Sequence, residues 1–153
     1  SQVYLNYFDK VLYSENIKHP YVGDKVKVET GLNYIMSEKN GEWECWIKTA
    51  SRTVLNNIEQ YTAMVDKYDY IGRRHETAVQ YSTAMFIGNR KLVDVWVDCP
   101  PKMDIASTIN TEPDWLRLYN RNLLENLFFS CCQRHSVRGL LINNLCIDRC
   151  IQN

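Results

Sequence analysis

The sequence predicts an α+β fold in which an antiparallel β-sheet packs against a small helical bundle. Two observations indicate this class. Short β-rich segments separated by turn residues occupy the chain up to about residue 48, and segments with helical periodicity follow them. A chain of 153 residues fits one domain, which buries roughly two thirds of the surface that the unfolded chain exposes. We therefore expect a single domain over residues 1–153.

The expected strands come first. Four segments are rich in β-branched and aromatic residues: VYLNYF (3–8), KVKVE (25–29), LNYIM (32–36) and EWECWIK (42–48). The turn residues Gly23-Asp24, Gly31 and Asn40-Gly41 separate them. Short strands joined in this way predict an antiparallel sheet.

Helical periodicity begins at about residue 51. Apolar and small residues recur there at a spacing of 3.6: Val54, Leu55, Ile58, Tyr61, Thr62 and Val65. They predict an amphipathic helix over residues 51–67 whose apolar stripe lies on the sheet. A second helix near residues 78–86, ended by Gly88-Asn89, is indicated by Ala78, Val79, Ser82, Met85 and Phe86.

The second half of the chain adds a strand and a long helix. LVDVWVD (92–98) alternates in polarity, with Val93, Val95 and Val97 on one face, and predicts a strand. Thr111 is suited to cap a helix over residues 111–132 in which Pro113 occupies the first turn. The pattern of the apolar segment VRGLLINNLCI (137–147) does not decide between strand and helix.

The segment GEWECW, residues 41–46, sets two tryptophans and two glutamates close together. In a strand, Trp43, Cys45 and Ile47 would share one face, which we expect the helices at 51–67 and 111–132 to cover. Glu42, Glu44 and Trp46 would share the opposite face. Two interpretations of that face stay open.

In the first, Trp46 packs half buried against a helix and the glutamates are solvated. In the second, the face is a platform for a cationic planar base: an aromatic ring attracts positive charge, and a glutamate accepts hydrogen bonds from the guanine N1 and N2 edge. N7-methylguanosine, the messenger RNA cap, fits the second interpretation.

Charge and hydropathy restrict the partners. Eighteen Lys and Arg residues balance 18 Asp and Glu residues, so no general attraction to nucleic acid or to a membrane surface is expected. No run approaches the ~18 apolar residues of a transmembrane helix, and the polar start SQVYLNYFDK lacks the apolar core of a signal peptide. We expect an intracellular protein without a membrane partner. The start at Ser1 indicates a piece excised from a larger protein, or processing.

The cysteines raise the question of a metal. Cys132, His135, Cys146 and Cys150 form the pattern C-x2-H-x10-C-x3-C, which has zinc-ligand residue types but not the spacing of a familiar finger. The other interpretation is that Cys131 and Cys132 are small buried hydrophobic residues late in a helix. We expect reduced, metal-free cysteines and no cofactor.

An enzymatic alternative uses the same residues. Cys131 with His135, or His75 with Cys99, could form a nucleophile pair of cysteine and histidine. A pair four residues apart late in a helix is more often a packed thiol beside a surface histidine. We therefore expect a non-catalytic protein.

Several strings in a shared order resemble the cap-binding domain of polymerase basic protein 2 of influenza and related orthomyxoviruses. They are the tyrosine-rich first segment, VETG, NGEWECW, SRTVLNNIEQY, GRRHETAVQYSTAMF, EPDWLRLYNRNLLENLFF and VRGLLIN. The resemblance spans nearly the whole chain. It implies an antiparallel sheet on a helical bundle, with the methylated base clamped between two rings while an acid reads its edge.

Carried over by residue, the resemblance is partial. It implies that Glu44, or Glu42 with a different gap, is the acid, that Trp46 and Phe86 are ring positions, and that Tyr4 is the aromatic of the first strand. The family's first clamp ring falls near Lys39 and Asn40, and its base-reading lysine falls near Asn57. With one ring and one cation missing, cap affinity should drop by roughly one or more orders of magnitude.

The resemblance implies a polymerase context and leaves two functions open. One is a cap-binding module that supplies capped host messenger RNA for cap-snatching and viral transcription, here with a degenerate site. The other is a structural domain of the same fold that has lost the cap and contacts other viral polymerase subunits or RNA. Either would work in the host nucleus and be carried in the virion. The departures indicate an orthomyxovirus divergent from influenza, such as a thogotovirus.

Overall fold

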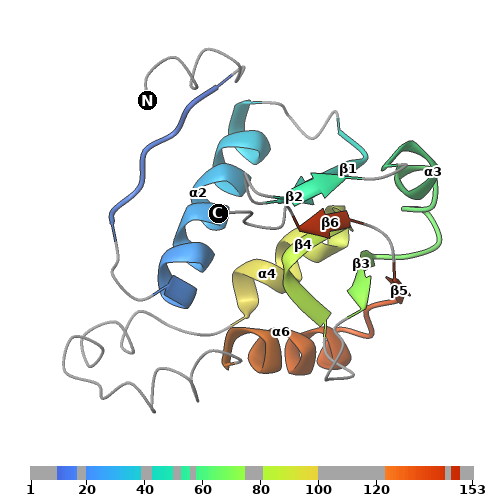
Figure 1. Cartoon of the computed structure of the whole chain (residues 1–153). Coiled ribbons are helices and arrows are strands. Elements are labelled where there is room, and N and C mark those ends of the chain that lie inside the picture. The colour runs from blue at the N-terminus through green and yellow to red at the C-terminus, as the bar shows by residue number, and fades with distance from the viewer. Residues whose placement is uncertain are drawn as a thin grey trace, which may run out of the picture.

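A computed structural model describes residues 10–16, 20–38, 43–49, 53–55, 58–74, 81–99, 123–143 and 146–148. Figure 1 shows the elements in chain order. They are α2 (Pro20–Glu38), β1 (Cys45–Lys48), β2 (Thr53–Leu55), α3 (Ile58–Thr62), β3 (Tyr70–Arg74), β4 (Tyr81–Asn89), α4 (Arg90–Asp98), α6 (Leu123–Arg134), β5 (Gly139–Ile142) and β6 (Cys146–Asp148).

A four-stranded sheet with the order β1-β4-β3-β5 forms the centre of the fold. β4 pairs antiparallel with both β1 and β3, whereas β5 joins β3 in parallel. β2 and β6 form a separate antiparallel pair. The predicted α+β class, with a sheet packed against helices, is confirmed, but the central sheet is mixed because β5 follows α6 and returns parallel to β3.

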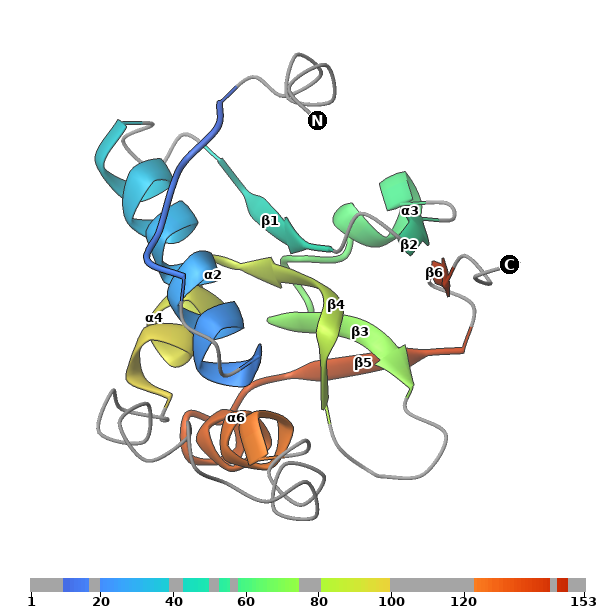
Figure 2. The same cartoon turned by 60° about the vertical axis from the view of Figure 1, so that its left-hand side comes forward.

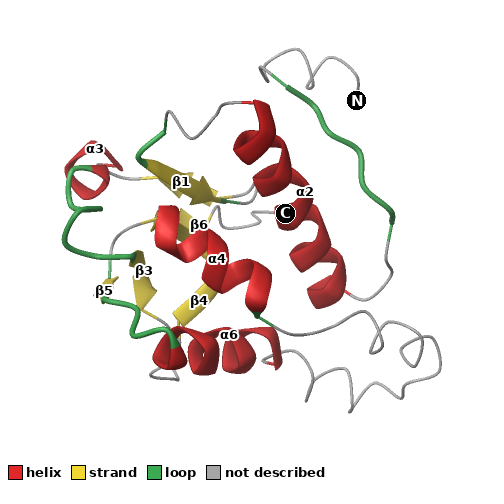
Figure 3. Ribbon diagram, turned by 180° about the vertical axis from the view of Figure 1, so that it is seen from behind, coloured by secondary structure: helices red, strands yellow, loops and turns green. Residues whose placement is uncertain are grey.

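The two faces of the central sheet carry separate apolar clusters. Alternate side chains of β3 and β4 point to opposite faces, so Tyr70 and Phe86 join one cluster while Ile71 and Ile87 join the other. Helices α2, α4 and α6 lie on the first face, and α3 lies on the second (Figure 2). From behind, α4 lies between α2 and α6 (Figure 3). The larger cluster, which we call the aromatic core, fills the space between these three helices and the sheet.

The prediction of strands at residues 25–29 and 32–36 is wrong, because both segments lie in α2. The apolar residues that pack there, Val28, Leu32 and Ile35, are spaced four and three residues apart and form one helical stripe against the aromatic core. Lys25 is buried and donates from Nζ to the carbonyl oxygen of Trp96. Packing against α4 thus overrides the high strand propensity of valine and tyrosine.

Two further elements are exchanged relative to the prediction. The segment expected as a helix near 78–86 contributes β4, which is buried on both faces and therefore shows no alternation. The segment 92–98, expected as a strand, lies in α4, where Leu92, Val93, Val95 and Trp96 are buried. Val97, assigned to the apolar face of that strand, is 52% exposed. The Asn89 side chain accepts from the Leu92 N–H at 3.4 Å and caps α4, a signal read as a helix end.

The remaining predictions are met in part. The helix expected over 51–67 is reduced to α3 and the turns after it, since Val54 and Leu55 lie in β2. α6 matches the end of the helix expected over 111–132, and residues 101–122 lie outside the described residues, as does segment 3–8. The unassigned segment 137–147 supplies β5 and the start of β6. Among the described helices, none combines the length and apolar character needed to cross a bilayer.

Candidate functional site

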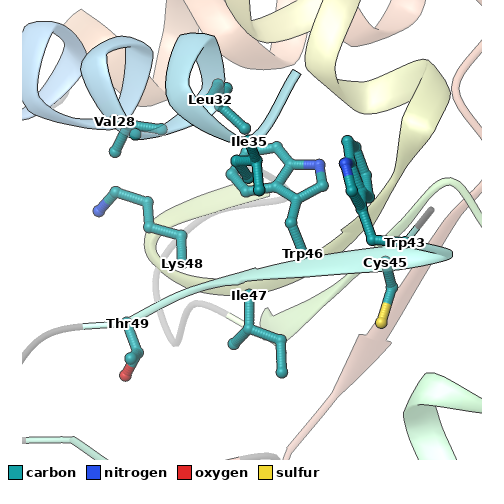
Figure 4. A pocket seen from close by; sticks show the side chains of 10 residues that line it. Val28, Leu32, Ile35, Trp43, Cys45, Trp46, Ile47, Lys48 and Thr49 are labelled. Atoms are coloured by element: carbon teal, nitrogen blue, oxygen red, sulfur yellow. The ribbon is translucent and has the colours of Figure 1, made fainter. Parts of the chain in front are cut away.

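Trp46 lies at the centre of β1 and points into the aromatic core. Its side chain lies beside α2, and the residue is 8% exposed (Figure 4). The indole N–H donates to the carbonyl oxygen of Asn89 at 3.1 Å, so its polar atom is satisfied within the domain. The pairing of Trp46 with Gly88 on β4 leaves room for the large ring. These contacts fix Trp46 as a structural side chain.

Phe86, the second predicted clamp ring, packs directly against Trp46. The ring centroids lie 5.0 Å apart with an interplanar angle of 79°, and Phe86 is 0% exposed. A base held between two rings needs parallel faces about 7 Å apart, which is twice the ordinary carbon contact distance. The structure therefore brings the two predicted rings together edge to face, without a slot between them.

Further rings of the aromatic core surround Phe86. The ring centroids of Trp96 and Phe128 each lie 5.7 Å from that of Phe86, and the ring centroid of Tyr70 lies 5.3 Å from it. The Tyr70 hydroxyl donates to the carbonyl oxygen of Ser82 at 2.7 Å. Phe86 is thus enclosed by rings from β1, β3, α4 and α6, and moving it aside for a ligand would disrupt the centre of the fold.

The predicted facing of the GEWECW segment is wrong. Trp46, assigned to the ligand face, points to the helices, whereas Cys45 packs against the opposite cluster and Ile47 is 37% exposed. Trp43 lies before the strand and also packs against the aromatic core (Figure 4). Cys45, Trp46 and Ile47 alternate as predicted but face the other way, and the bend at Glu44 before the strand ends the alternation, so Trp43 packs on the same side as Trp46.

Glu44, the predicted base-reading acid, is exposed and lies apart from the ring pair. It lines a surface cleft of about 410 Å³ with Trp43, Asp66 and two cations, Arg90 and Lys91. The Arg90 guanidinium lies 5.8 Å from the centroid of the Trp43 ring. Glu44 and Asp66 balance the charges of Arg90 and Lys91, but a cationic base would have to displace the Arg90 guanidinium before it could stack on Trp43.

A second groove lies between α2 and β1. It has a volume of about 460 Å³ and is lined largely by apolar side chains, among them Leu32, Ile35 and Trp43 (Figure 4). At one end Lys48 pairs with Asp24, with Nζ and Oδ2 2.8 Å apart. The ion pair leaves the Lys48 charge compensated, so the groove suits an apolar group better than an anionic one.

The other predicted site residues cannot be placed. Tyr4, Glu42, Lys39, Asn40 and Asn57 lie outside the described residues. That the first clamp ring and the base-reading lysine of the resembled family are absent from this site therefore stays a prediction.

The late cysteines and His135 form a different arrangement from the predicted one. Cys131 and Cys132 are buried in α6, which confirms their interpretation as small core residues. His135 Nε2 lies 2.9 Å from Oδ2 of Asp98, and Cys131 lies beside them. The spacing of Cys131 and His135 is visible in the sequence, but the approach of Asp98 is not, because the pattern of residues 92–98 predicts a strand whose end need not meet α6.

The cysteine side chains that the structure describes, Cys45, Cys99, Cys131 and Cys132, are not joined in disulfides. Burial raises the pKa of Cys99 to about 12, with a further contribution from Cys131. Burial also raises the pKa of Cys132. The side chains of Cys146 and Cys150 lie outside the described part, as does His75, so neither the proposed finger pattern nor the pair of His75 with Cys99 can be placed.

The geometry defines an α+β domain whose two candidate clamp rings belong to its core. Comparison with known proteins adds no family: no family model matches the chain, and no curated protein or solved structure was found to be similar to it.

Proposed function

We propose that the chain is a non-catalytic domain of a viral RNA polymerase subunit, of the kind associated with cap-snatching, whose cap site is degenerate. It acts as a structural domain that contacts other polymerase subunits or RNA. The observation that carries the loss of cap binding is the closed pair of Trp46 and Phe86, which are 8% and 0% exposed and pack edge to face.

Two physical arguments support this choice over a working cap clamp. Opening a slot between the rings would break the hydrogen bond from Trp46 to Asn89 and expose Phe86, and burial of one such ring contributes about 1.5–3 kcal/mol. A cap must then offset that cost with stacking that contributes about 1–3 kcal/mol per base. The two terms cancel, which leaves no net affinity from the ring pair.

The half-buried Trp43 does not replace the clamp. One indole beside Glu44 offers a ring and an acid, but the Arg90 guanidinium already lies over that ring. A methylated base would have to displace Arg90 from this ring before it could stack there. N7-methylation should therefore not strengthen the binding of guanine nucleotides at this cleft.

The polymerase context rests on the sequence resemblance. The polymerase context can be tested by co-expressing the chain with the other polymerase subunits encoded by the same genome. The complex is then purified through an affinity tag on the chain. We expect the subunits to be retained in a washed complex, while a parallel resin carrying N7-methylguanosine retains no more of the chain than a guanosine resin. Retention on the methylated resin alone, without the subunits, would contradict the proposal.

A further inference from the structure

We infer that Asp98, Cys131 and His135 form a zinc site where the C-terminal ends of α4 and α6 meet. One ligand atom from each of the three residues lies within 4.8 Å of the other two. Among the described residues, this is the group of histidine, cysteine and acidic side chains that is close enough to share one metal ion. The set differs from the finger pattern of the sequence, from which it keeps only His135.

The backbone holds the three residues in place. Cys131 and His135 are four residues apart, and the His135 N–H donates to the Cys131 carbonyl oxygen at 3.0 Å, which continues the last turn of α6. Ser136 then adopts a positive φ of 52°, and the Val137 N–H donates to the Cys132 carbonyl oxygen at 2.9 Å. This is a helix end of the left-handed type, which fixes where His135 stands.

The third residue comes from the packed neighbour helix. Asp98 is the last residue of α4, and the next N–H, that of Cys99, donates back to the Trp96 carbonyl oxygen at 3.3 Å. The ring centroids of Trp96 and Phe128 lie 5.3 Å apart, and this contact connects α4 with α6. The two helix ends therefore meet over a rigid contact, and their carbonyl ends both favour a cation.

The donor set suits zinc. A thiolate, an imidazole and a carboxylate are its usual ligands, at about 2.0–2.3 Å, which places two ligands of a tetrahedral ion roughly 3.3–3.8 Å apart. The distance between His135 Nε2 and Asp98 Oδ2, 2.9 Å, needs to widen by about half an ångström. That adjustment is easy, because the side chains of His135 and Asp98 are 36% and 65% exposed.

Charge and proton balance also fit. Zinc replaces the thiol proton of Cys131, which leaves as H⁺, and the resulting thiolate together with the Asp98 carboxylate neutralises the ion. Arg134 donates from Nη2 to Cys131 Sγ at 3.2 Å, a contact that orients the sulfur as an outer-shell partner would. The fourth position falls to a water molecule or to Cys99, whose thiol is hydrogen-bonded with that of Cys131.

The same residues do not suit nucleophilic catalysis. Cys131 is 0% exposed, so its sulfur cannot reach the carbonyl or phosphoryl group of a substrate without unfolding the end of α6. A buried sulfur with a partly exposed imidazole and carboxylate at the rim can enclose an ion from one side. The site would thus join α4 to α6 and stabilise the fold.

The test is a cobalt titration of the complete chain after removal of metals with a chelator. Cobalt(II) reports on thiolate ligation through a charge-transfer band, and zinc should displace it. We expect about one equivalent to bind, the band to vanish in Cys131→Ser, and zinc to raise the midpoint of thermal unfolding of the parent chain. Asp98→Asn and His135→Gln should each weaken binding at least ~10-fold.

Matched controls separate ligation from general effects. Cys45→Ser removes a thiol that packs against the opposite face of the sheet, and Asp94→Asn removes an exposed carboxylate one turn before Asp98. Neither should alter binding. Because Cys131→Ser alters a buried residue, His135→Gln at the rim decides the question if the serine variant does not fold. Absence of cobalt binding by the folded parent chain, or unchanged binding by His135→Gln, would overturn the inference and leave an ordinary ion pair of His135 with Asp98.

Discussion

Arg138 donates three hydrogen bonds to the buried carboxylate of Asp69. Its backbone N–H and Nε donate to Oδ2 at 2.8 and 3.3 Å, and Nη2 donates to Oδ1 at 2.9 Å. Asn89 adds a bond from Nδ2 to Oδ1 at 2.8 Å. Asp69 precedes β3, Arg138 precedes β5 and Asn89 caps α4, so one carboxylate connects three elements of the fold.

Removing this charge should destabilise the domain. Asp69→Asn keeps the size of the side chain but turns an amide donor toward the Arg138 donors, and we expect a loss of about 2–3 kcal/mol in the free energy of unfolding at neutral pH. The expected loss is no larger because the Arg138 side chain is 56% exposed and solvent screens its charge. Urea unfolding measures it, with the exposed Asp66→Asn as the matched control, expected within ~0.5 kcal/mol of the parent. Equal midpoints for both variants would contradict the assigned role.

The same carboxylate should make stability depend on pH. Burial alone would raise the pKa of Asp69, but the bonds from Arg138 and Asn89 and the nearby Lys91 outweigh it and hold the pKa well below its usual range. An acid with a lowered folded-state pKa stabilises the fold above its unfolded pKa of about 3.9, and this stability is lost as the pH falls toward the folded value. The difference in unfolding free energy between parent and Asp69→Asn should therefore shrink below about pH 4. A difference that stays constant from pH 7 to about pH 2.5 would show that Asp69 acts through packing.

Two glycines should respond in opposite directions to alanine. A Cβ on Gly88 would lie 2.7 Å from Leu92 Cδ2 and 2.9 Å from Trp46 Nε1, whereas a Cβ on Gly31 meets nothing within 4 Å. Gly88→Ala should destabilise the domain by about 1–3 kcal/mol through overpacking. Gly31→Ala, inside α2, should stabilise it by about 0.5–1 kcal/mol. Thermal melts of both variants measure this, and a stabilised Gly88→Ala would show that Trp46 is not fixed against β4.

Phe86 should act as a core residue. Because its ring is 0% exposed and touches rings from four elements, Phe86→Ala should cost about 3–5 kcal/mol in the free energy of unfolding. Tyr13→Ala, at a position that is 83% exposed, is the matched aromatic control and should change stability by less than ~0.5 kcal/mol. A ring kept for a ligand would show the reverse pattern in unfolding experiments, with little cost at Phe86.

The fold class could be predicted from the sequence, but several element types could not. Residues 92–98 carry valines at every second position and also buried residues at positions 92, 93, 95 and 96. A segment of seven residues fits both the strand period of two and the helix period of 3.6. The Asn89 cap and the packing on α6 favour the helix. β4 is buried on both faces, so its pattern resembled a helix. Short apolar segments take their structure from tertiary contacts that local periodicity does not contain.

The candidate site could be predicted only as a set of residue types. Trp46 and Phe86, predicted to share one site, are in contact, but their burial makes them core residues and not a clamp. The predicted facing was reversed because alternation shows which residues share a face but not which face the helices cover, and the bend at Glu44 places Trp43 on the side of Trp46. Asp98 was missed beside His135 because a partner 37 residues distant is found only once α4 and α6 are helices.

The most direct test is a titration of the complete chain with an N7-methylguanosine cap analogue and with its unmethylated counterpart, followed by tryptophan fluorescence. Because Trp46 and Phe86 pack against each other, we predict that methylation of the ligand does not increase the quenching of tryptophan fluorescence. Both ligands should have dissociation constants above ~100 μM, and Trp46→Phe should leave these constants unchanged. Methyl-selective binding tighter than ~10 μM that is lost in Trp46→Phe and kept in Trp43→Phe would contradict the proposal, because it would show that the ring pair opens and clamps the cap.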